Sequence, residues 1–259
     1  MKDKTSSDIF HFKQFDVAQE HCAMKIGTDG VLLGALCPLP DTSTTPLRLL
    51  DIGTGTGLIA LMLAQRLSDR GIHDFHIDAV EIDPQAAQQA RENAEASPWG
   101  DCIEVHPCSL QEFSAQLSAD IKYDVIVSNP PFYNATLKPE DEARAVARHK
   151  DALPLDEISN FSHNHLNDNG LLALIYPTDY DTEVMTSAIA QGLTPRGLCH
   201  ILTKVGKPCK RRISWFGAAG ANIDPSTPLQ THTLAIRDAE GNYTDEYKNL
   251  TEPFYVSLR

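Results

Sequence analysis

The motif Asn129-Pro130-Pro131-Phe132 contains the residues whose types and spacing most clearly suggest chemistry. It follows the apolar run from residue 123 to 128, which has the composition of a buried strand. Because two prolines cannot donate backbone hydrogen bonds, the strand should end there and leave Asn129 at its carboxyl end, where ligands bind in open α/β sheets. An amide acceptor, a rigid turn and an aromatic plane together suit a planar group that carries an NH2. The motif therefore predicts transfer of a chemical group to that nitrogen.

A glycine-rich loop, Asp51-Ile52-Gly53-Thr54-Gly55-Thr56-Gly57, joins a strand predicted over 47–52 to a helix predicted over 58–67. Glycine allows unusual backbone angles and close approach of a ligand to the chain. Dinucleotide sites have the spacing Gly-x-Gly-x-x-Gly, but the position three past Gly55 is Leu58. Asp51 places a carboxylate beside the loop, which disfavours a pyrophosphate and favours an ammonium group. The loop therefore favours S-adenosylmethionine, which carries an ammonium and a sulfonium and no phosphate.

Two further strand ends supply polar side chains. Glu81 ends a strand predicted over 77–82, and a carboxylate there can accept both hydroxyls of a ribose. Asp83 before Pro84 predicts a helix cap, with the helix running to about residue 96. A third strand over 103–105 leads to Ser109, which could meet the adenine of the cofactor. The ends of parallel strands share one edge of a sheet, so these side chains should form one site.

Strand and helix patterns alternate along the rest of the chain. Apolar spacing predicts helices over 155–166 and 182–190. Strand patterns follow at four places: 171–176, 199–204, 213–217 and 231–236. This order predicts an α/β protein with a mostly parallel sheet, helices on both faces and right-handed crossovers. The segments around the basic residues, 199–204 and 213–217, resemble a hairpin and should add an antiparallel edge.

Length and composition favour a single domain. The chain has 259 residues, 42% of them hydrophobic, which is enough for one sizeable α/β core. We interpret residues 1–45 as an N-terminal extension and residues 46–259 as the domain. No apolar stretch approaches the ~20 residues of a membrane span, and the N-terminus lacks an apolar secretory segment. We therefore expect a cytoplasmic protein without a membrane partner.

Cysteine and histidine spacing does not predict a metal site. The six cysteines form no Cys-x-x-Cys pair and fit no zinc pattern, so free thiols are expected. His73 and His76 form one histidine pair and His163 and His165 another, but each pair lacks a nearby third ligand in the sequence. We therefore expect no metal, and we infer no obligate protein partner.

Charge is distributed unevenly along the chain. The net charge of −13 argues against bulk attraction to nucleic acid. Between residues 184 and 223, however, there is no Asp or Glu, and six basic residues occur: Arg196, Lys204, Lys207, Lys210, Arg211 and Arg212. A basic face on an acidic body suits a polyanion that is engaged locally, while a solvated loop explains the pattern equally well. Trp215 and Phe216 could stack on bases, but their strand composition favours a core position.

Taken together, the motifs resemble the class I S-adenosylmethionine-dependent methyltransferases. The segments 51–57, 81 and 129–132 match the cofactor loop, the ribose carboxylate and the amino-methylation motif of that class. The resemblance implies a Rossmann-like, mostly parallel seven-stranded sheet with an antiparallel C-terminal edge strand. It narrows to the bacterial enzymes that N6-methylate adenine 37 in the anticodon loop of valine tRNA, through three segments of the chain: Phe10–Phe15, Lys25–Gly34 and Tyr247–Tyr255.

This resemblance implies a set of cofactor contacts. The residues that would bind S-adenosylmethionine are Asp51, Gly53, Gly55, Gly57, Glu81, Ser109 and Thr28. The segment 25–30 would cover the cofactor from the N-terminal extension. Many relatives place an acidic residue near position 109, where this chain has serine. A backbone amide or Glu112 could therefore supply the adenine contact in place of Ser109.

The resemblance also implies a mechanism and an RNA surface. The side-chain oxygen of Asn129 and the carbonyl of Pro130 would accept hydrogen bonds from the adenine NH2, favour a pyramidal nitrogen and stabilise its developing charge. Pro131 keeps the turn rigid, and Phe132 would stack on a base turned out of its loop. Tyr133 could extend that plane. The tRNA backbone would contact the basic residues Lys204, Lys207, Lys210, Arg211 and Arg212.

Other functions fit parts of the pattern. An rRNA guanine N2-methyltransferase shares the chemistry, because the motif specifies an amide-like or exocyclic nitrogen and not adenine itself. A protein glutamine N5-methyltransferase usually carries a helical domain before the cofactor domain, and only about 50 residues precede Asp51 here. A non-catalytic RNA-binding module would not need Asn129 and its prolines. A dinucleotide-dependent oxidoreductase is disfavoured by the glycine spacing.

Overall fold

The apolar runs of the sequence form the parallel strands of one sheet. The computed structural model describes residues 8–22, 25–40, 46–132, 154–218 and 229–257. Strands buried on both faces need apolar residues at successive positions, as at residues 125–127. Five strands in the described residues run parallel to one another: β3 (Leu47–Ile52), β4 (Phe75–Glu81), β5 (Ile103–Pro107), β6 (Tyr123–Ser128) and β7 (Leu166–Pro177). They match the predicted strand order.

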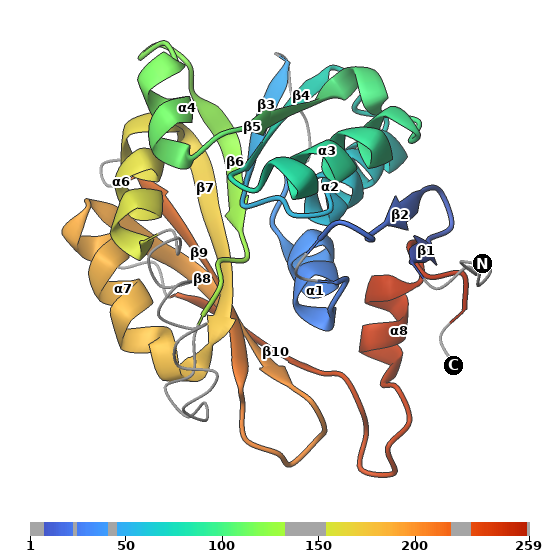
Figure 1. Cartoon of the computed structure of the whole chain (residues 1–259). Helices are drawn as coiled ribbons and strands as arrows, with labels where there is room; N and C mark the ends of the chain where they lie inside the picture. Colours follow the sequence, from blue (N-terminus) through green and yellow to red (C-terminus); the bar gives the residue numbers. More distant parts are fainter. Residues whose placement is uncertain (1–7, 23–24, 41–45, 133–153, 219–228, 258–259) are drawn as a thin grey trace, which may run out of the picture.

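Helices cover both faces of this sheet (Figure 1). One face carries α1 (Thr28–Leu36), α2 (Leu58–Asp69), α3 (Pro84–Glu95) and α8 (Asp245–Thr251). The other carries α4 (Leu110–Gln116), α6 (Leu155–His165) and α7 (Asp181–Ala190). Two short 3-10 turns, η1 (Gly100–Cys102) and η2 (Thr178–Tyr180), precede β5 and α7. Over the described ranges, no helix combines the length and apolar character needed to cross a membrane.

The C-terminal strands correct two details of the predicted sheet. Within the described residues it has eight strands and not seven, in the order β10-β8-β9-β7-β6-β3-β4-β5. The hairpin prediction is confirmed, because β8 (Leu193–Leu202) and β9 (Arg211–Ala218) pair antiparallel. The antiparallel strand is not at the edge, however: β9 lies between β7 and β8, and β10 (Gln230–Ala235) forms the edge parallel to β8. Burial gives the reason, since Ile213 and Phe216 of β9 are fully buried and the first four residues of β10 are exposed.

The N-terminal segment is part of the apolar core. Strands β1 (Ile9–His11) and β2 (Asp16–Ala18) form a small antiparallel ribbon beside the C-terminal residues. The backbone N–H of Lys13 donates to the carbonyl of Phe254 at 2.8 Å. Phe12 and Phe15 are buried in the same apolar cluster as α1 and α2. A boundary at residue 45 therefore cuts through a shared core, and the proposed division of the chain stays a prediction.

Candidate active site at the carboxyl ends of the strands

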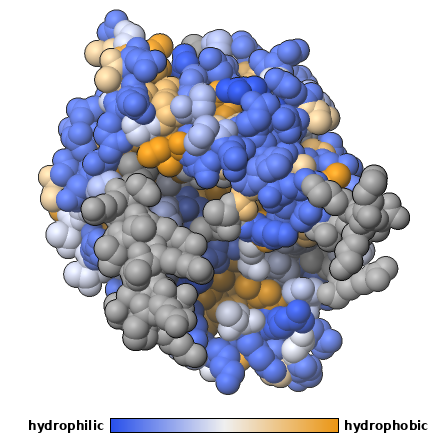
Figure 2. Space-filling view, viewed as in Figure 1, coloured by the Kyte–Doolittle hydropathy of each residue, from blue (hydrophilic) through white to orange (hydrophobic). Residues whose placement is uncertain are grey.

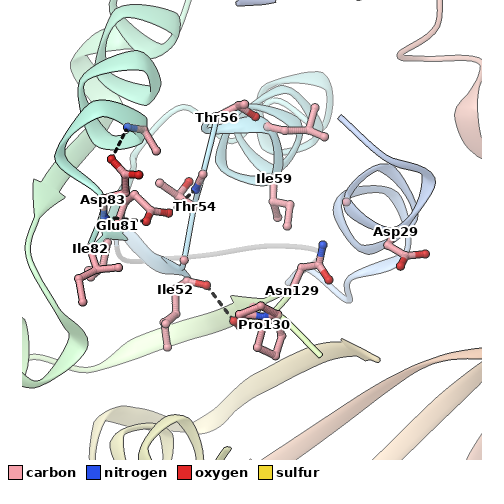
Figure 3. Close-up of a pocket in the computed structure, with 18 of the residues that line it drawn as sticks. Asp29, Ile52, Thr54, Thr56, Ile59, Glu81, Ile82, Asp83, Asn129 and Pro130 are labelled. Atoms are coloured by element: carbon pink, nitrogen blue, oxygen red, sulfur yellow. Dashed lines mark hydrogen bonds between the residues drawn. The ribbon is translucent and has the colours of Figure 1, made fainter. Parts of the chain in front are cut away.

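A pocket of about 900 Å³ lies where β3, β4 and β6 end. The space-filling view shows a hollow near the middle of the molecule, with hydrophilic surface above it and hydrophobic surface at its lower margin (Figure 2). In the close-up, Glu81, Ile82 and Asp83 lie on one side of the glycine loop and Asn129 and Pro130 on the other (Figure 3). The pocket brings together nine of the residues predicted for the site: Gly53, Gly55, Glu81, Ser109, Asn129, Pro130, Pro131, Phe132 and Arg211.

The glycine loop is folded against the end of β4. Gly53, Gly55 and Gly57 all have positive φ angles, of 72°, 58° and 82°, which other residue types rarely adopt. The backbone N–H groups of Gly53 and Thr54 both donate to the carbonyl of Val80, at 2.8 and 3.0 Å. The loop therefore presents its backbone to the pocket. Gly57 itself does not line the pocket, because it faces Ala90 of α3 at close range.

The end of β4 offers a carboxylate and an apolar side chain next to each other. Glu81 accepts hydrogen bonds from the backbone N–H of Gly55 at 2.8 Å and of Asp83 at 3.0 Å, which fixes its position in the pocket wall. Ile82 also lines the pocket, and it is 57% exposed although it is a large apolar residue. Asp83 caps α3 as predicted, since its side chain accepts from the N–H groups of Gln85 and Ala86. Sequence reasoning missed Ile82, although its place after Glu81 was a usable signal.

Asp51 lies beneath the loop and does not line the pocket. Its carboxylate is fully buried, and Oδ2 accepts a hydrogen bond of 2.6 Å from the hydroxyl of Thr54. Among the described residues, the other oxygen, Oδ1, makes no hydrogen bond of ordinary geometry. Burial raises the pKa of Asp51 to about 7, because water no longer stabilises the charged form. Thr54 separates this carboxylate from the pocket, so a direct contact with a cofactor stays a prediction.

The Asn129 motif follows a strand end that is locked in place. The hydroxyl of Ser128 donates to the carbonyl of Ile52 at 2.8 Å and so joins the ends of β6 and β3. Asn129 and both prolines then line the pocket. The Phe132 ring contacts two tyrosines, with centroids 4.8 Å from Tyr180 and 6.3 Å from Tyr176. The motif thus presents an amide, a turn and an aromatic surface together.

Tyr176 is a pocket residue that the sequence did not single out. Its hydroxyl lies 2.7 Å from Ser214 Oγ and donates to Asp181 Oδ1 at 3.0 Å. Burial is the main cause that raises the pKa of this tyrosine, so it is a neutral hydrogen-bonding group. Its position inside an apolar strand run gave no signal, because tyrosine is common in buried strands.

The segment before β3 forms another wall, but Thr28 is not part of it. The pocket is lined instead by neighbouring residues of that segment, namely Cys22, Lys25, Ile26, Gly27, Asp29 and Gly30. Asp29 accepts a hydrogen bond of 2.9 Å from Arg211 Nε and forms an ion pair with it. This contact joins α1 to the start of β9. Asp29 was suggested from the sequence as a cofactor contact together with Thr28, but its pairing with Arg211 was not predicted, because the two residues are 182 positions apart.

Ser109 lines the pocket as the first residue of a capping box. Its side chain accepts from the backbone N–H of Glu112, and the Glu112 carboxylate accepts from the N–H and hydroxyl of Ser109 at 2.9 and 2.8 Å. The pair therefore stabilises the start of α4. Glu112 does not line the pocket. Which group meets an adenine stays a prediction.

The predicted basic residues divide into three environments. Arg211 lines the pocket, whereas Arg212 pairs with Asp181 and has a side chain only 17% exposed. Lys207 and Lys210 are exposed and Lys204 is half-buried, all outside the pocket. Trp215 and Phe216 pack into the core from β9, as expected. The last predicted RNA contact, Tyr133, lies outside the described residues.

The fold and the pocket define a class I methyltransferase. A crystal structure described as a predicted O-methyltransferase from Agrobacterium tumefaciens superposes with a TM-score of 0.61 at 16% identity, covering 90% of this chain and 99% of that one. Residues 31–189 also match the family model of the methyltransferase small domain. The glycine loop and the Asn129 motif both fall inside the matched range.

Relatives with higher identity define the family more narrowly. A tRNA1(Val) (adenine(37)-N6)-methyltransferase from Porphyromonas gingivalis is 43% identical over 97% of this chain and 96% of its own length. A protein of the same name from Bacteroides fragilis is 42% identical over 98% of this chain and 100% of its own length. The chain therefore belongs to the tRNA1(Val) (adenine(37)-N6)-methyltransferase family.

Proposed function

We propose that the protein methylates N6 of adenine 37 in a valine tRNA, with S-adenosylmethionine as the methyl donor. The observation that carries this proposal is the single pocket that combines the glycine loop, Glu81 and the Asn129 motif. The high identity to relatives named for this reaction supports the choice of substrate. A cytoplasmic location follows from the same proposal.

The pocket fits the donor in its size and its chemistry. A volume of about 900 Å³ lies within the range of small-molecule and cofactor sites. Glu81 would hold the ribose hydroxyls, because its oxygens retain lone pairs beyond the two backbone hydrogen bonds they accept. Exposed Ile82 offers an apolar surface for the adenine, and Ser109 lies on the same side of the pocket. When bound, S-adenosylmethionine supplies a methyl group on a positively charged sulfur.

The protein's own residues position the target nitrogen. The side-chain oxygen of Asn129 and the carbonyl of Pro130 accept hydrogen bonds from the adenine NH2 and so orient its lone pair toward the cofactor side of the pocket. The same two acceptors stabilise the positive charge that develops on nitrogen. Phe132 stacks on the base. Most of the rate enhancement then comes from alignment, because both reactants are held at fixed positions.

The pocket also offers contacts for a base and for a neighbouring phosphate. Phe132 contacts Tyr176, and Arg211 lies on β9 beside the end of β7 that carries Tyr176. Among the described residues that line the pocket, Lys25 and Arg211 are the two cations. Lys25 pairs with Asp8 at 3.1 Å, in the N-terminal segment. Arg211 is also paired, with Asp29 at 2.9 Å, but it lies beside the end of β7 that carries Tyr176. We therefore expect Arg211 to meet a phosphate next to the target nucleotide. Lys207 and Lys210 would contact the RNA further out.

One experiment tests this proposal directly. The protein is incubated with labelled S-adenosylmethionine and total tRNA from a strain that lacks the gene, and the labelled nucleoside is identified by mass spectrometry. We expect N6-methyladenosine in one valine tRNA, mapped to position 37 by fragment analysis. A parallel assay supplies ribosomal extract in place of tRNA. Label in N2-methylguanosine of rRNA, or in a protein glutamine, would then identify a substrate other than valine tRNA. Absence of transfer to every pool would favour a binding module.

A further inference from the structure

Four side chains of metal-binding types meet on one face of β4 and β5, outside the pocket. His76 and Asp78 are two residues apart on β4, and Glu104 and His106 are two residues apart on β5. Residues two apart in a strand point to the same face. The parallel register pairs Asp78 with Glu104 and places His106 beside residue 80. Sequence analysis found no third ligand for His76, because only this register brings the two strands' side chains together.

The distances in the cluster resemble those between atoms that share one metal ion. Asp78 Oδ1 lies 3.3 Å from His76 Nε2 and 2.8 Å from His106 Nε2, and His76 Nε2 lies 3.7 Å from Glu104 Oε2. Ligand atoms at about 2.0–2.2 Å from a zinc ion lie roughly 2.8–3.6 Å from each other. The ligand atoms of His76, Asp78 and Glu104 all fall within 4.8 Å of one another, whereas His106 lies outside this group and contacts Asp78.

The surroundings orient these groups. Asp78 Oδ2 accepts hydrogen bonds from Arg48 Nε at 3.1 Å and from the Tyr123 hydroxyl at 2.9 Å, so Oδ1 is the oxygen directed at the two imidazoles. The His106 ring packs against Phe113, with centroids 4.8 Å apart. In metal sites, hydrogen bonds and packing of this kind hold the ligands in the orientation that the ion requires.

Charge and access are also consistent with a cation. The buried carboxylate of Asp78 faces Arg48 on one side only, and Glu104 adds a second negative charge near the imidazoles. Asp78 is almost fully buried, but the side chains of His76 and Glu104 are 34% and 63% exposed. An ion from solvent can therefore reach the open side of the cluster.

We propose that His76, Asp78 and Glu104 form a binding site for a divalent transition-metal ion of the zinc type, with His106 hydrogen-bonded to Asp78 beside it. The imidazole nitrogen among these ligands favours Zn²⁺, Co²⁺ or Ni²⁺ over Mg²⁺ and Ca²⁺, which prefer oxygen ligands alone. The ion would fasten the edge strand β5 to β4. Since β5 leads directly to Cys108 and Ser109, the site would stabilise one wall of the pocket without supplying a reacting group.

The test measures binding of Zn²⁺ to the full chain after removal of metals by a chelator. Calorimetry should give one ion per chain, and the Tm should rise by about 5–10 °C at a hundredfold excess of Zn²⁺ over its Kd. His76→Gln and Glu104→Gln change partly exposed side chains and should keep the fold, which circular dichroism checks. Each should weaken Zn²⁺ binding at least tenfold and reduce the Tm shift accordingly.

A matched control and a spectroscopic probe keep the result specific. His11 pairs with Asp16 at 2.8 Å, without a third ligand group in the described part of the chain, so His11→Gln should bind Zn²⁺ like the unchanged protein. Co²⁺ should give visible bands without thiolate charge transfer, because no cysteine belongs to the site. The absence of saturable binding, equal binding by His76→Gln, or thiolate bands from Co²⁺ would each overturn the proposal. None of these readouts depends on methyl transfer.

Discussion

At the scale of single residues, Asn129 carries the main chemical prediction. Its amide lines the pocket at the end of β6, where Ser128 anchors the backbone to Ile52. Asn129→Ala removes one acceptor for the target NH2 and leaves the cofactor end of the pocket intact. We expect kcat to fall by about 10²–10³-fold, the usual effect of losing one preorganised polar group. Single-turnover methylation of tRNA measures this loss.

Cofactor binding supplies the control for that variant. Glu81 and Ile82 lie on the other side of the glycine loop from Asn129 (Figure 3). Asn129→Ala should therefore bind S-adenosylmethionine with little change in Kd by calorimetry. Near-normal turnover in this variant would exclude the proposed role of the amide.

Asp51 gives a prediction about pH. Its pKa is raised from 3.8 to about 7 in the folded protein by burial. Between these two values the folded state holds a proton that the unfolded state has lost, so stability should fall as pH rises through this window. Asp51→Asn removes the charge and should make the protein more stable above pH 7, by at most about 4 kcal/mol at 1.4 kcal/mol per pKa unit. Urea denaturation without cofactor at several pH values measures this difference.

A second carboxyl provides the comparison for Asp51. Asp83 is exposed and caps α3, so Asp83→Asn makes the same chemical change at a site outside the core and serves as the matched control. If Asp51→Asn showed the same slope as the unchanged protein, burial would not control the titration of Asp51.

Some residues of the site could be predicted from the sequence and others could not. The glycines, Glu81 and Asn129 could be predicted, because each stands where an apolar strand run stops and strand ends meet at one edge. Asp29 and Arg211 could not be paired, because they lie 182 positions apart and meet only in the folded chain. Asp51 was placed correctly at a strand end, but its burial beneath Thr54 depends on packing by α2 and gave no local signal.

At the scale of elements, the β8–β9 connection and the start of β9 carry the basic residues. The structure separates Arg212, which pairs with Asp181 inside the fold, from exposed Lys207 and Lys210. Changing the two lysines together to alanine should weaken tRNA binding and lower the slope of log K against log salt by roughly 1.5–2, about one phosphate contact for each lysine. Filter binding at several salt concentrations measures the slope.

Two further variants make that measurement specific. Lys122 precedes β6 at the amino end of the strands, opposite the pocket, so Lys122→Ala removes one lysine charge at a distant place. It should leave the slope unchanged. Arg212→Ala should instead lower the free energy of unfolding, because Asp181 and Tyr176 lose a charged neighbour. If the variant with both Lys207 and Lys210 changed to alanine had the same salt slope as the unchanged protein, the β8–β9 connection would not belong to the RNA interface.

The elements were predictable where local patterns decide them. Strands β3 and β6 match their predicted ranges, because turn residues bound a continuous apolar run on each side. Helix α1 was not expected, since Gly30 and Gly34 have low helix propensity. Gly34 is tolerated there because α1 packs closely on α2: a Cβ at this position would lie 2.7 Å from the sulfur of Met62. The insertion of β9 between β7 and β8 depends on tertiary pairing alone.

At the scale of the whole molecule, the described N-terminal ribbon β1–β2 and the segment after α8 lie side by side next to the helices on one face of the sheet (Figure 1). Phe12 stacks on Phe15 and on Tyr255, with centroids 4.7 and 5.9 Å apart. Asn93 of α3 then connects this N-terminal segment to the site. Its side chain accepts from the N–H of Ala18 and donates to the carbonyls of Ala18 and Thr56, each at 2.9 Å.

This connection predicts that Asn93 links the N-terminal segment to cofactor affinity. Asn93→Ala leaves three backbone groups without their partner and should lower the free energy of unfolding by about 1–3 kcal/mol. Because one of them belongs to Thr56 in the glycine loop, the Kd for S-adenosylmethionine should also rise. Phe12→Ala should cost about 3–5 kcal/mol of stability through lost packing, yet change the Kd little at temperatures where it stays folded. Calorimetry together with urea denaturation separates the two effects.

Gln88 provides the matched control on the same helix. It is an exposed residue of α3 whose side chain donates to Glu92 and does not reach the loop. Gln88→Ala should therefore change neither the stability nor the Kd appreciably. If Asn93→Ala lost stability but kept the Kd of the unchanged protein, the N-terminal segment would support the fold without positioning the loop. If Asn93→Ala raised the Kd while Phe12→Ala and Gln88→Ala did not, the Asn93 side chain would be the group that couples the N-terminal segment to the cofactor site.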